Sequence, residues 1–243
     1  MIDRPELLNG VPIPYGASVA QLLGMIESSG SEKWAAIMAL AHCDADEALH
    51  LLGNLAQSSD TYIRRAAIEA IGRHARGHMA GQLVCKRLED SSDYIVRSAC
   101  KAAVALKLRA AHGGIQILLK HRSQSLRLVA VQSLAVLWRN SDFSKVFQLM
   151  QSDPADEVRK EAAWTLRKHA LRSNWHLLFD TWRREHPPRH RVWACQLAEA
   201  FGGSDILQFL AQLATDRDGH VRKAACRAID IIQERPLDTS LPD

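Results

Sequence analysis

Apolar and small residues recur along the chain in a unit of about 31 residues. Most units have an aliphatic residue, a basic residue next to it, a small residue three positions later and an aliphatic residue four positions beyond that. The basic positions are Lys33, Arg64, Arg97, Arg127, Arg159, Arg191 and Arg222. The small residues are Ala36, Ala67, Cys100, Ala130, Ala162, Ala194 and Ala225. Because helical residues advance by ~100° each, positions −1, +3 and +7 from the basic residue share one face of a helix. The pattern therefore predicts one helix in each unit, with this face buried.

A second apolar stretch separates consecutive units, so each unit predicts two short antiparallel helices. One such pair cannot bury its own apolar faces, whereas a stack of pairs can. We therefore expect an all-α fold, a right-handed α-solenoid of about seven helix pairs. The repeats are expected over 18–232, between an N-terminal extension (1–17) and a polar C-terminal tail (233–243). The expected pairs cover 18–41, 46–74, 78–107, 111–139, 142–170, 173–202 and 204–232.

The turn before the basic helix of each unit carries residues that commonly cap a helix N-terminus. The expected capping residues are Ser59 or Asp60, Ser92 or Asp93, Ser123, Asp153 and Asp218. Pro154 follows Asp153, which predicts an N-cap and then a first helical residue at this position.

These repeated positions resemble those of HEAT repeats, specifically the short HEAT-like type named after the phycobilisome (PBS) lyases. The resemblance covers 18–232, and the units at Lys33 and Arg191 depart from it by lacking the aliphatic residue before the basic one. It implies an armadillo-like helical scaffold in which the second helix of each pair lines the concave side. It also implies that the repeated arginines form a hydrogen-bonded ladder between repeats, rather than a row of phosphate ligands.

Composition and charge narrow the classes of protein. Hydrophobic residues make up 47% of the chain and charged residues 24%, which excludes a disordered or collagen-like chain. The net charge is +4, yet residues 61–193 hold 24 Lys or Arg against 11 Asp or Glu. Residues 1–60 hold two against eight, and residues 194–243 hold five against eight. A basic middle between acidic ends predicts a partner that carries negative charge.

Five cysteines without a CxxC pair indicate a reducing compartment, and no leader or bilayer-spanning segment is evident. We therefore expect a cytoplasmic protein. Cys100, Cys195 and Cys226 fall at positions +3 or +4, where the pattern predicts burial.

Signatures of catalysis are missing from the sequence. It contains no P-loop, no Gly-rich dinucleotide loop, no Gly-x-Ser-x-Gly elbow and no zinc-ligand spacing. HEAT-like deoxyhypusine hydroxylases use His-Glu pairs to bind iron, and this chain contains no His-Glu dipeptide. We therefore predict a protein that is not an enzyme, with no catalytic residues, no cofactor and no metal site.

The exposed face of the basic helices is the predicted binding surface. Positions +1, +5, +8 and +12 point away from the buried stripe, and in the middle of the chain they carry cations and one Trp. The predicted partner-binding residues are Arg65, Arg76, Arg109, Arg139, Lys160, Trp164, Arg167 and Arg227. A Pro-containing basic loop adds a second predicted contact through Arg183, Arg184 and Arg189.

Three functions are compatible with this surface. The first is a scaffold for protein–protein interaction, whose partner presents an acidic surface. The second is nucleic-acid binding, for which Trp164 and Glu199 resemble the Trp and carboxylate of the DNA alkylpurine glycosylases, HEAT-like solenoids with a basic groove. The third is a bilin-lyase-type enzyme or accessory protein. We expect neither a membrane nor a metal as partner.

Overall fold

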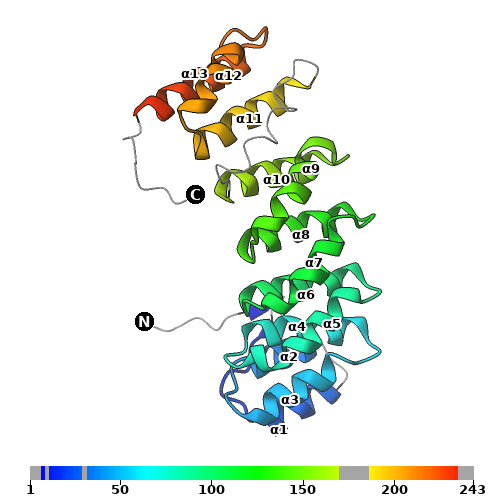
Figure 1. The fold of residues 1–243 in the computed structure, drawn as a ribbon. Helices are drawn as coiled ribbons and strands as arrows, with labels where there is room; N and C mark the ends of the chain where they lie inside the picture. The colour runs from blue at the N-terminus through cyan, green and yellow to red at the C-terminus, as the bar shows by residue number, and fades with distance from the viewer. Residues whose placement is uncertain (1–6, 9–10, 29–31, 170–185, 235–243) are drawn as a thin grey trace. The chain divides into compact units, whose positions relative to one another are not determined.

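The computed structural model describes residues 7–8, 11–28, 32–169 and 186–234, most of which lie in helices (Figure 1). The chain divides into two compact units, Met1–Leu137 and Trp138–Asp243. Consecutive helices within each unit form pairs, as the sequence predicts. In the described ranges, no helix is both long enough and apolar enough to cross a membrane.

The first unit has four helix pairs among its described residues. Short 3-10 segments, η1 (Gly77–Ala80), η2 (Arg87–Glu89) and η3 (Arg109–Ala111), extend the first helices of the third and fourth pairs. Two strands of two residues, β1 (Leu7–Leu8) and β2 (Val11–Pro12), pair antiparallel ahead of the first helix. The helices are α1 (Val19–Glu27), α2 (Glu32–Leu40), α3 (Asp46–Leu55), α4 (Thr61–Arg73), α5 (Gly81–Lys86), α6 (Asp93–Ala105), α7 (His112–Leu118) and α8 (Gln124–Val136).

The second unit continues the same order of helices. Two 3-10 segments, η4 (Asn140–Asp142) and η6 (Ser204–Ile206), lead into first helices. The first helix expected within 173–202 falls largely on residues 170–185, outside the described residues. The helices are α9 (Phe143–Ser152), α10 (Asp156–His169), α11 (Pro188–Phe201), α12 (Leu207–Leu213) and α13 (Gly219–Glu234).

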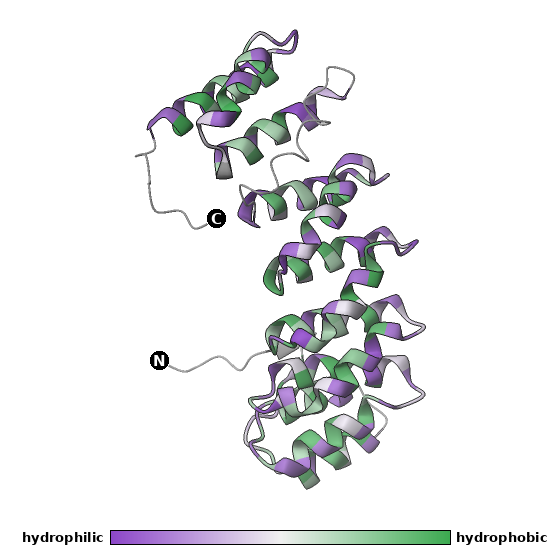
Figure 2. Ribbon diagram, in the orientation of Figure 1, coloured by the Kyte–Doolittle hydropathy of each residue, from purple (hydrophilic) through white to green (hydrophobic). Residues whose placement is uncertain are grey.

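Second helices pack against one another within each unit. In the first unit α4 lies between α2 and α6, and α8 packs on the other side of α6. In the second unit α11 packs against both α10 and α13. Figure 2 shows hydrophilic and hydrophobic residues mixed along these helices, and the buried residues of each helix are mostly apolar. The small residues at +3 are all fully buried: Ala36, Ala67, Cys100, Ala130, Ala162, Ala194 and Ala225.

At four of the five turns an expected capping residue directly precedes the second helix, and at two of them its side chain makes capping hydrogen bonds. Asp60 accepts hydrogen bonds from the backbone N–H groups of two α4 residues, at 2.7 and 3.3 Å, and Asp218 does the same in α13. Ser92 and Ser123 are N-caps whose side chains make no capping hydrogen bond. The expectation for Asp153 is wrong, because α10 begins only at Asp156. The Asp153 carboxylate instead accepts from the backbone N–H of Ala155 and shapes the turn.

Candidate binding surface

The repeated arginines close the turn that precedes their own helix. Arg64 donates from Nη1 to the backbone carbonyls of Ser58 and Ser59, at 2.9 and 2.8 Å. The same contact to carbonyls six and five residues earlier recurs for Arg127, Arg159 and Arg222. These guanidinium groups satisfy carbonyls that the turn leaves without a helical partner. The prediction that they serve the structure is confirmed.

Some of these arginines also reach the turn of the following repeat. Arg64 forms an ion pair with Asp90 at 3.4 Å, and Arg97 donates to the Ser125 hydroxyl at 2.6 Å. Arg191 is fully buried and donates from Nε and Nη2 to the two carboxylate oxygens of Asp216, both at 2.9 Å. The predicted ladder between repeats is therefore present within each unit.

The predicted surface residues fall into two groups. Arg65 lies on α4, Arg227 on α13, and Lys160, Trp164 and Arg167 all lie on α10. These five lie on second helices, as predicted. Trp164 is 57% exposed, which agrees with its assignment to the face opposite the buried stripe.

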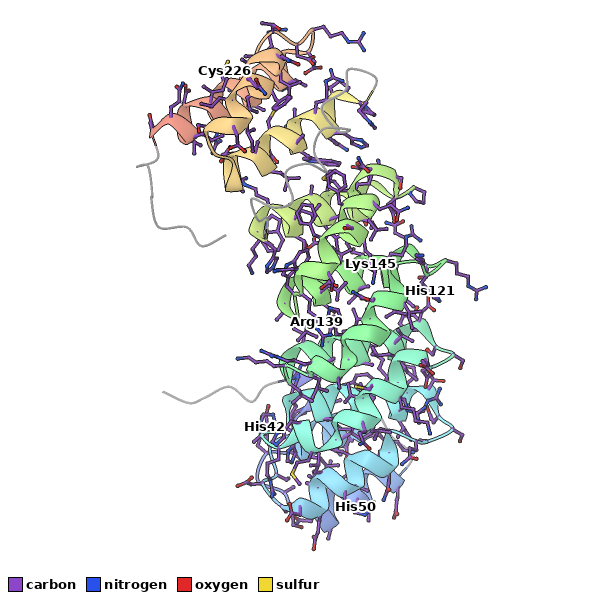
Figure 3. The ribbon with its side chains drawn as sticks, in the orientation of Figure 1. His42, His50, His121, Arg139, Lys145 and Cys226 are labelled. Atoms are coloured by element: carbon purple, nitrogen blue, oxygen red, sulfur yellow. The ribbon has the colours of Figure 1, made fainter. Side chains whose placement is uncertain are left out.

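The remaining three residues do not lie on second helices, which corrects the prediction. Arg76 follows the end of α4, Arg109 begins η3, and Arg139 lies between α8 and η4. The helices α4, α6 and α8 end three or more residues before the +12 position, so the chain has already turned there. Figure 3 labels Arg139 in such a connection.

Several of the predicted cations are paired with acidic groups. Arg76 forms ion pairs with Asp44 at 3.8 Å and Asp46 at 2.5 Å, and Lys160 with Asp156 at 2.7 Å. The Lys160 hydrogen bond, followed by that from Arg189, holds the pKa of Asp156 at about 2, well below its ordinary value. Such pairs lower the positive charge that these residues offer to a partner.

The predicted basic loop is only partly within the described residues. Arg183 and Arg184 lie outside them. Arg189 lies in the first turn of α11, where its guanidinium pairs with Asp156 and lies 5.9 Å from the centre of the Trp193 ring. Both contacts tie Arg189 to helices of its own unit.

Glu199 forms the centre of a charged cluster on the second unit. It lies on α11, is only 8% exposed, and pairs with Arg167 of α10 at 2.9 Å and with Arg227 of α13 at 3.4 Å. One carboxylate thus joins three successive second helices. Beside it on α10, the Lys168 ammonium lies 5.6 Å from the centre of the exposed Trp164 ring.

The structure also exposes second-helix cations outside the predicted set of binding residues. They are exposed, and none has an ion pair with another described residue. Three of them occupy helical positions +4 or +9, which lie beside the positions used for the prediction. A wider angular window would have found them. These cations are Arg73 on α4, Lys101 on α6, Lys168 on α10 and Lys223 on α13.

Histidines and cysteines form no metal-binding cluster among the described residues. In Figure 3 the labelled His42, His50 and His121 lie apart on different parts of the first unit. Burial raises the pKa of the Cys100 and Cys195 thiols to about 12.

Cys226 is exposed, contrary to the prediction of burial. Position +4 lies at the edge of the buried stripe. No helix follows α13 among the described residues to cover that edge.

Part of the chain matches the model of a known family of helical repeats. Residues 19–105 match the family model of HEAT repeats. That segment covers α1 to α6, the first three helix pairs of the first unit. No curated protein matches the chain significantly.

Solved structures extend the likeness over most of the chain. YibA of Escherichia coli is similar with a TM-score of 0.60 and 17% identity, over 89% of this chain and 81% of that one. The archaeal HEAT-like repeats protein from Thermococcus onnurineus NA1 is similar with a TM-score of 0.53 and 15% identity, over 89% and 97% of the two chains. The fold is thus the all-α solenoid of HEAT-repeat and armadillo-like proteins.

Proposed function

We propose that this protein is a non-enzymatic scaffold that binds another protein through the exposed, basic faces of the second helices in each of its two units. The observation that carries the proposal is a set of four exposed cations, one on each of α4, α6, α10 and α13, that have no acidic partner among the described residues. Repeat solenoids commonly use such an extended face to bind partners. Uncompensated positive charge favours an acidic segment of the partner.

The test compares two variants that carry the same change in charge. The face variant combines Arg73→Glu, Lys101→Glu, Lys168→Glu and Lys223→Glu. The control variant combines Lys86→Glu, Lys120→Glu, Arg122→Glu and Arg217→Glu, which replace exposed cations outside the second helices. Each is used as bait, with the wild type, for quantitative capture of proteins from a cell extract.

We expect the wild type and the control variant to capture the same proteins, and the face variant to lose those with acidic segments. Equal capture by all three baits would contradict the proposed face. Capture of nucleic acid in place of protein, lost in the face variant alone, would contradict the proposed class of partner.

Nucleic-acid binding is the second candidate, and it is favoured by one observation. Trp164 is 57% exposed on α10, between cations at 160, 167 and 168. An exposed aromatic ring among cations can stack on a base while the cations contact phosphates. A loss of oligonucleotide binding in Trp164→Ala, with peptide binding unchanged, would support this candidate.

A further inference from the structure

Large aromatic side chains gather on the second helices of three consecutive repeats in the first unit. Trp34 lies on α2, Tyr62 on α4 and Tyr94 on α6. Tyr62 is 74% exposed and Tyr94 is 61% exposed, and the rings of Trp34 and Tyr62 meet edge to face at 5.8 Å. Exposed aromatic groups clustered on a rigid surface mark interaction sites more often than isolated apolar residues do.

Arg65 links these rings into one patch. Its guanidinium carbon lies 5.2 Å from the centre of the Trp34 ring and 5.9 Å from that of Tyr94. Nε donates to Glu69 at 3.0 Å, while the two Nη groups have no acceptor among the described residues. The hydroxyls of Tyr62 and Tyr94 also have no hydrogen-bond partner there. The patch therefore presents fixed rings with unused donors at its surface.

Two adjoining hollows, each of about 310 Å³, share the Arg65 side chain. The first is aromatic and is lined by Thr61, Tyr62, Arg65 and Tyr94. The second is basic and lies between α4 and α6, where Arg65, Arg73 and Lys101 outnumber the carboxylate of Glu69. Its lining also includes the small residues Gly72 and Ala102. A Cβ added to Gly72 would lie 2.9 Å from the Ala102 Cα, so the two helices approach closely there.

We infer that this patch binds an extended acidic peptide segment that carries an aromatic anchor. The anchor enters the hollow between Tyr62 and Tyr94, where Arg65 also meets it. The acidic side chains of the same segment follow the cations of the second hollow, Arg73 and Lys101. This inference rests on the proposed function and names one site and one ligand chemistry within it.

A peptide fits these contacts better than a nucleic-acid strand does. Glu69 lines the basic hollow and accepts a hydrogen bond from the Ser98 hydroxyl at 2.8 Å, so the hollow suits a few spaced carboxylates better than an unbroken row of phosphates. Residues 1–60, which include the helix of Trp34, hold eight acidic residues against two basic ones. A strand with a phosphate at every nucleotide would be repelled on leaving the patch toward α2, whereas a short peptide over α4 and α6 would not.

The test is a selection from a random peptide library, with peptides of about 12 residues, on the full chain. Enriched sequences are then made as labelled peptides, and their Kd values are measured by fluorescence anisotropy. We expect enriched peptides to combine Asp or Glu with an aromatic residue. Replacing that aromatic residue by Ala, or combining Tyr62→Ala with Tyr94→Ala in the protein, should weaken binding about tenfold.

A matched control keeps this test independent of folding. Met79→Ala with Ile117→Ala removes two exposed apolar side chains of the same unit outside the patch, and it should leave the Kd unchanged. Both tyrosines are exposed and lack hydrogen bonds to described residues, so the double Tyr variant should keep the fold, which its circular dichroism spectrum checks.

The possible failures of this inference and of the proposed function can be told apart. If acidic peptides bind the double Tyr variant with unchanged Kd but bind the four-site face variant more weakly, the inference is overturned and the proposed function stands. Enrichment of no acidic peptide would overturn both. An oligothymidylate that binds more tightly than the peptides, with the same dependence on the tyrosines, would replace the peptide by a nucleic acid.

Discussion

At the scale of single residues, the arginine of each repeat connects turns and helices in a way that the sequence predicts only in part. The repeated position and its structural role follow from the spacing alone. The individual partners do not, because the sequence gives no distance between one turn and the next. Arg64 reaches Asp90, and Arg191 reaches Asp216, across 25 or 26 residues. The ion pairs of Arg76 with Asp44 and Asp46 could not be predicted for the same reason.

The buried pair of Arg191 and Asp216 should be the most sensitive of these contacts. Asp216→Ala leaves a fully buried guanidinium without its carboxylate, and removing one partner of a buried pair costs about 3–5 kcal/mol. Asp218→Ala, which removes only the cap of α13, should cost about 1 kcal/mol. Urea unfolding of the two variants measures the difference. Equal losses of stability would show that the buried pair is no more important than a cap.

Asp90 should make stability depend on pH in the acid range. Burial raises its pKa, but hydrogen bonds from the Ser92 N–H, Arg64 and Arg87 outweigh burial and lower the pKa below the ordinary value of 3.8. A carboxyl group with a lowered folded-state pKa stabilises the protein above its unfolded-state pKa, and this stabilisation is lost as pH falls through the folded-state value. We expect Asp90→Asn to lower the unfolding free energy at pH 7 and to differ less from the wild type below about pH 4. A difference that stays constant with pH would contradict this assignment.

At the scale of helices, the repeated apolar and small positions predict well which residues are buried, and they predict poorly where each helix ends. All seven small residues at +3 are fully buried, because a period of 3.6 residues reports directly which face packs. The positions of Arg76, Arg109 and Arg139 beyond the helices were not predictable from the period. The spacing of apolar residues shows which face of a helix is buried, but it does not mark the residue at which the helix ends. The aromatic patch was also missed. Its signal is an aromatic residue near the start of three successive second helices, at Trp34, Tyr62 and Tyr94.

The close packing of second helices predicts the effect of larger side chains at +3. Ala162→Leu or Ala225→Leu should destabilise the protein by about 1–3 kcal/mol through overpacking, because both alanines are fully buried. Ala211→Leu, at an exposed position on α12, should change the unfolding free energy by less than about 0.5 kcal/mol. The unfolding midpoint in urea reports each change. Wild-type stability for both buried variants would mean that the repeat register is misassigned.

At the scale of the whole molecule, the net charge of +4 conceals where positive charge is available. Many arginines form hydrogen bonds with turn carbonyls or ion pairs with nearby carboxylates. A count of basic residues therefore overstates the positive charge that is available to a partner. Four exposed cations on second helices, two in each unit, form no ion pair with an acidic group among the described residues. Sequence composition could place the basic segment, but only geometry separates paired cations from unpaired ones.

The most direct test of a face that binds acidic protein segments is fluorescence anisotropy with two labelled ligands of equal negative charge. One is an acidic peptide with an aromatic residue, and the other is an oligothymidylate, each titrated at about 50 and 200 mM salt. We expect the peptide to bind more tightly at both salt concentrations. Its affinity should fall about tenfold or more in the four-site face variant, and should not change in the matched control variant. Tighter binding of the oligothymidylate, with a steep salt dependence that disappears in the face variant, would contradict a protein partner.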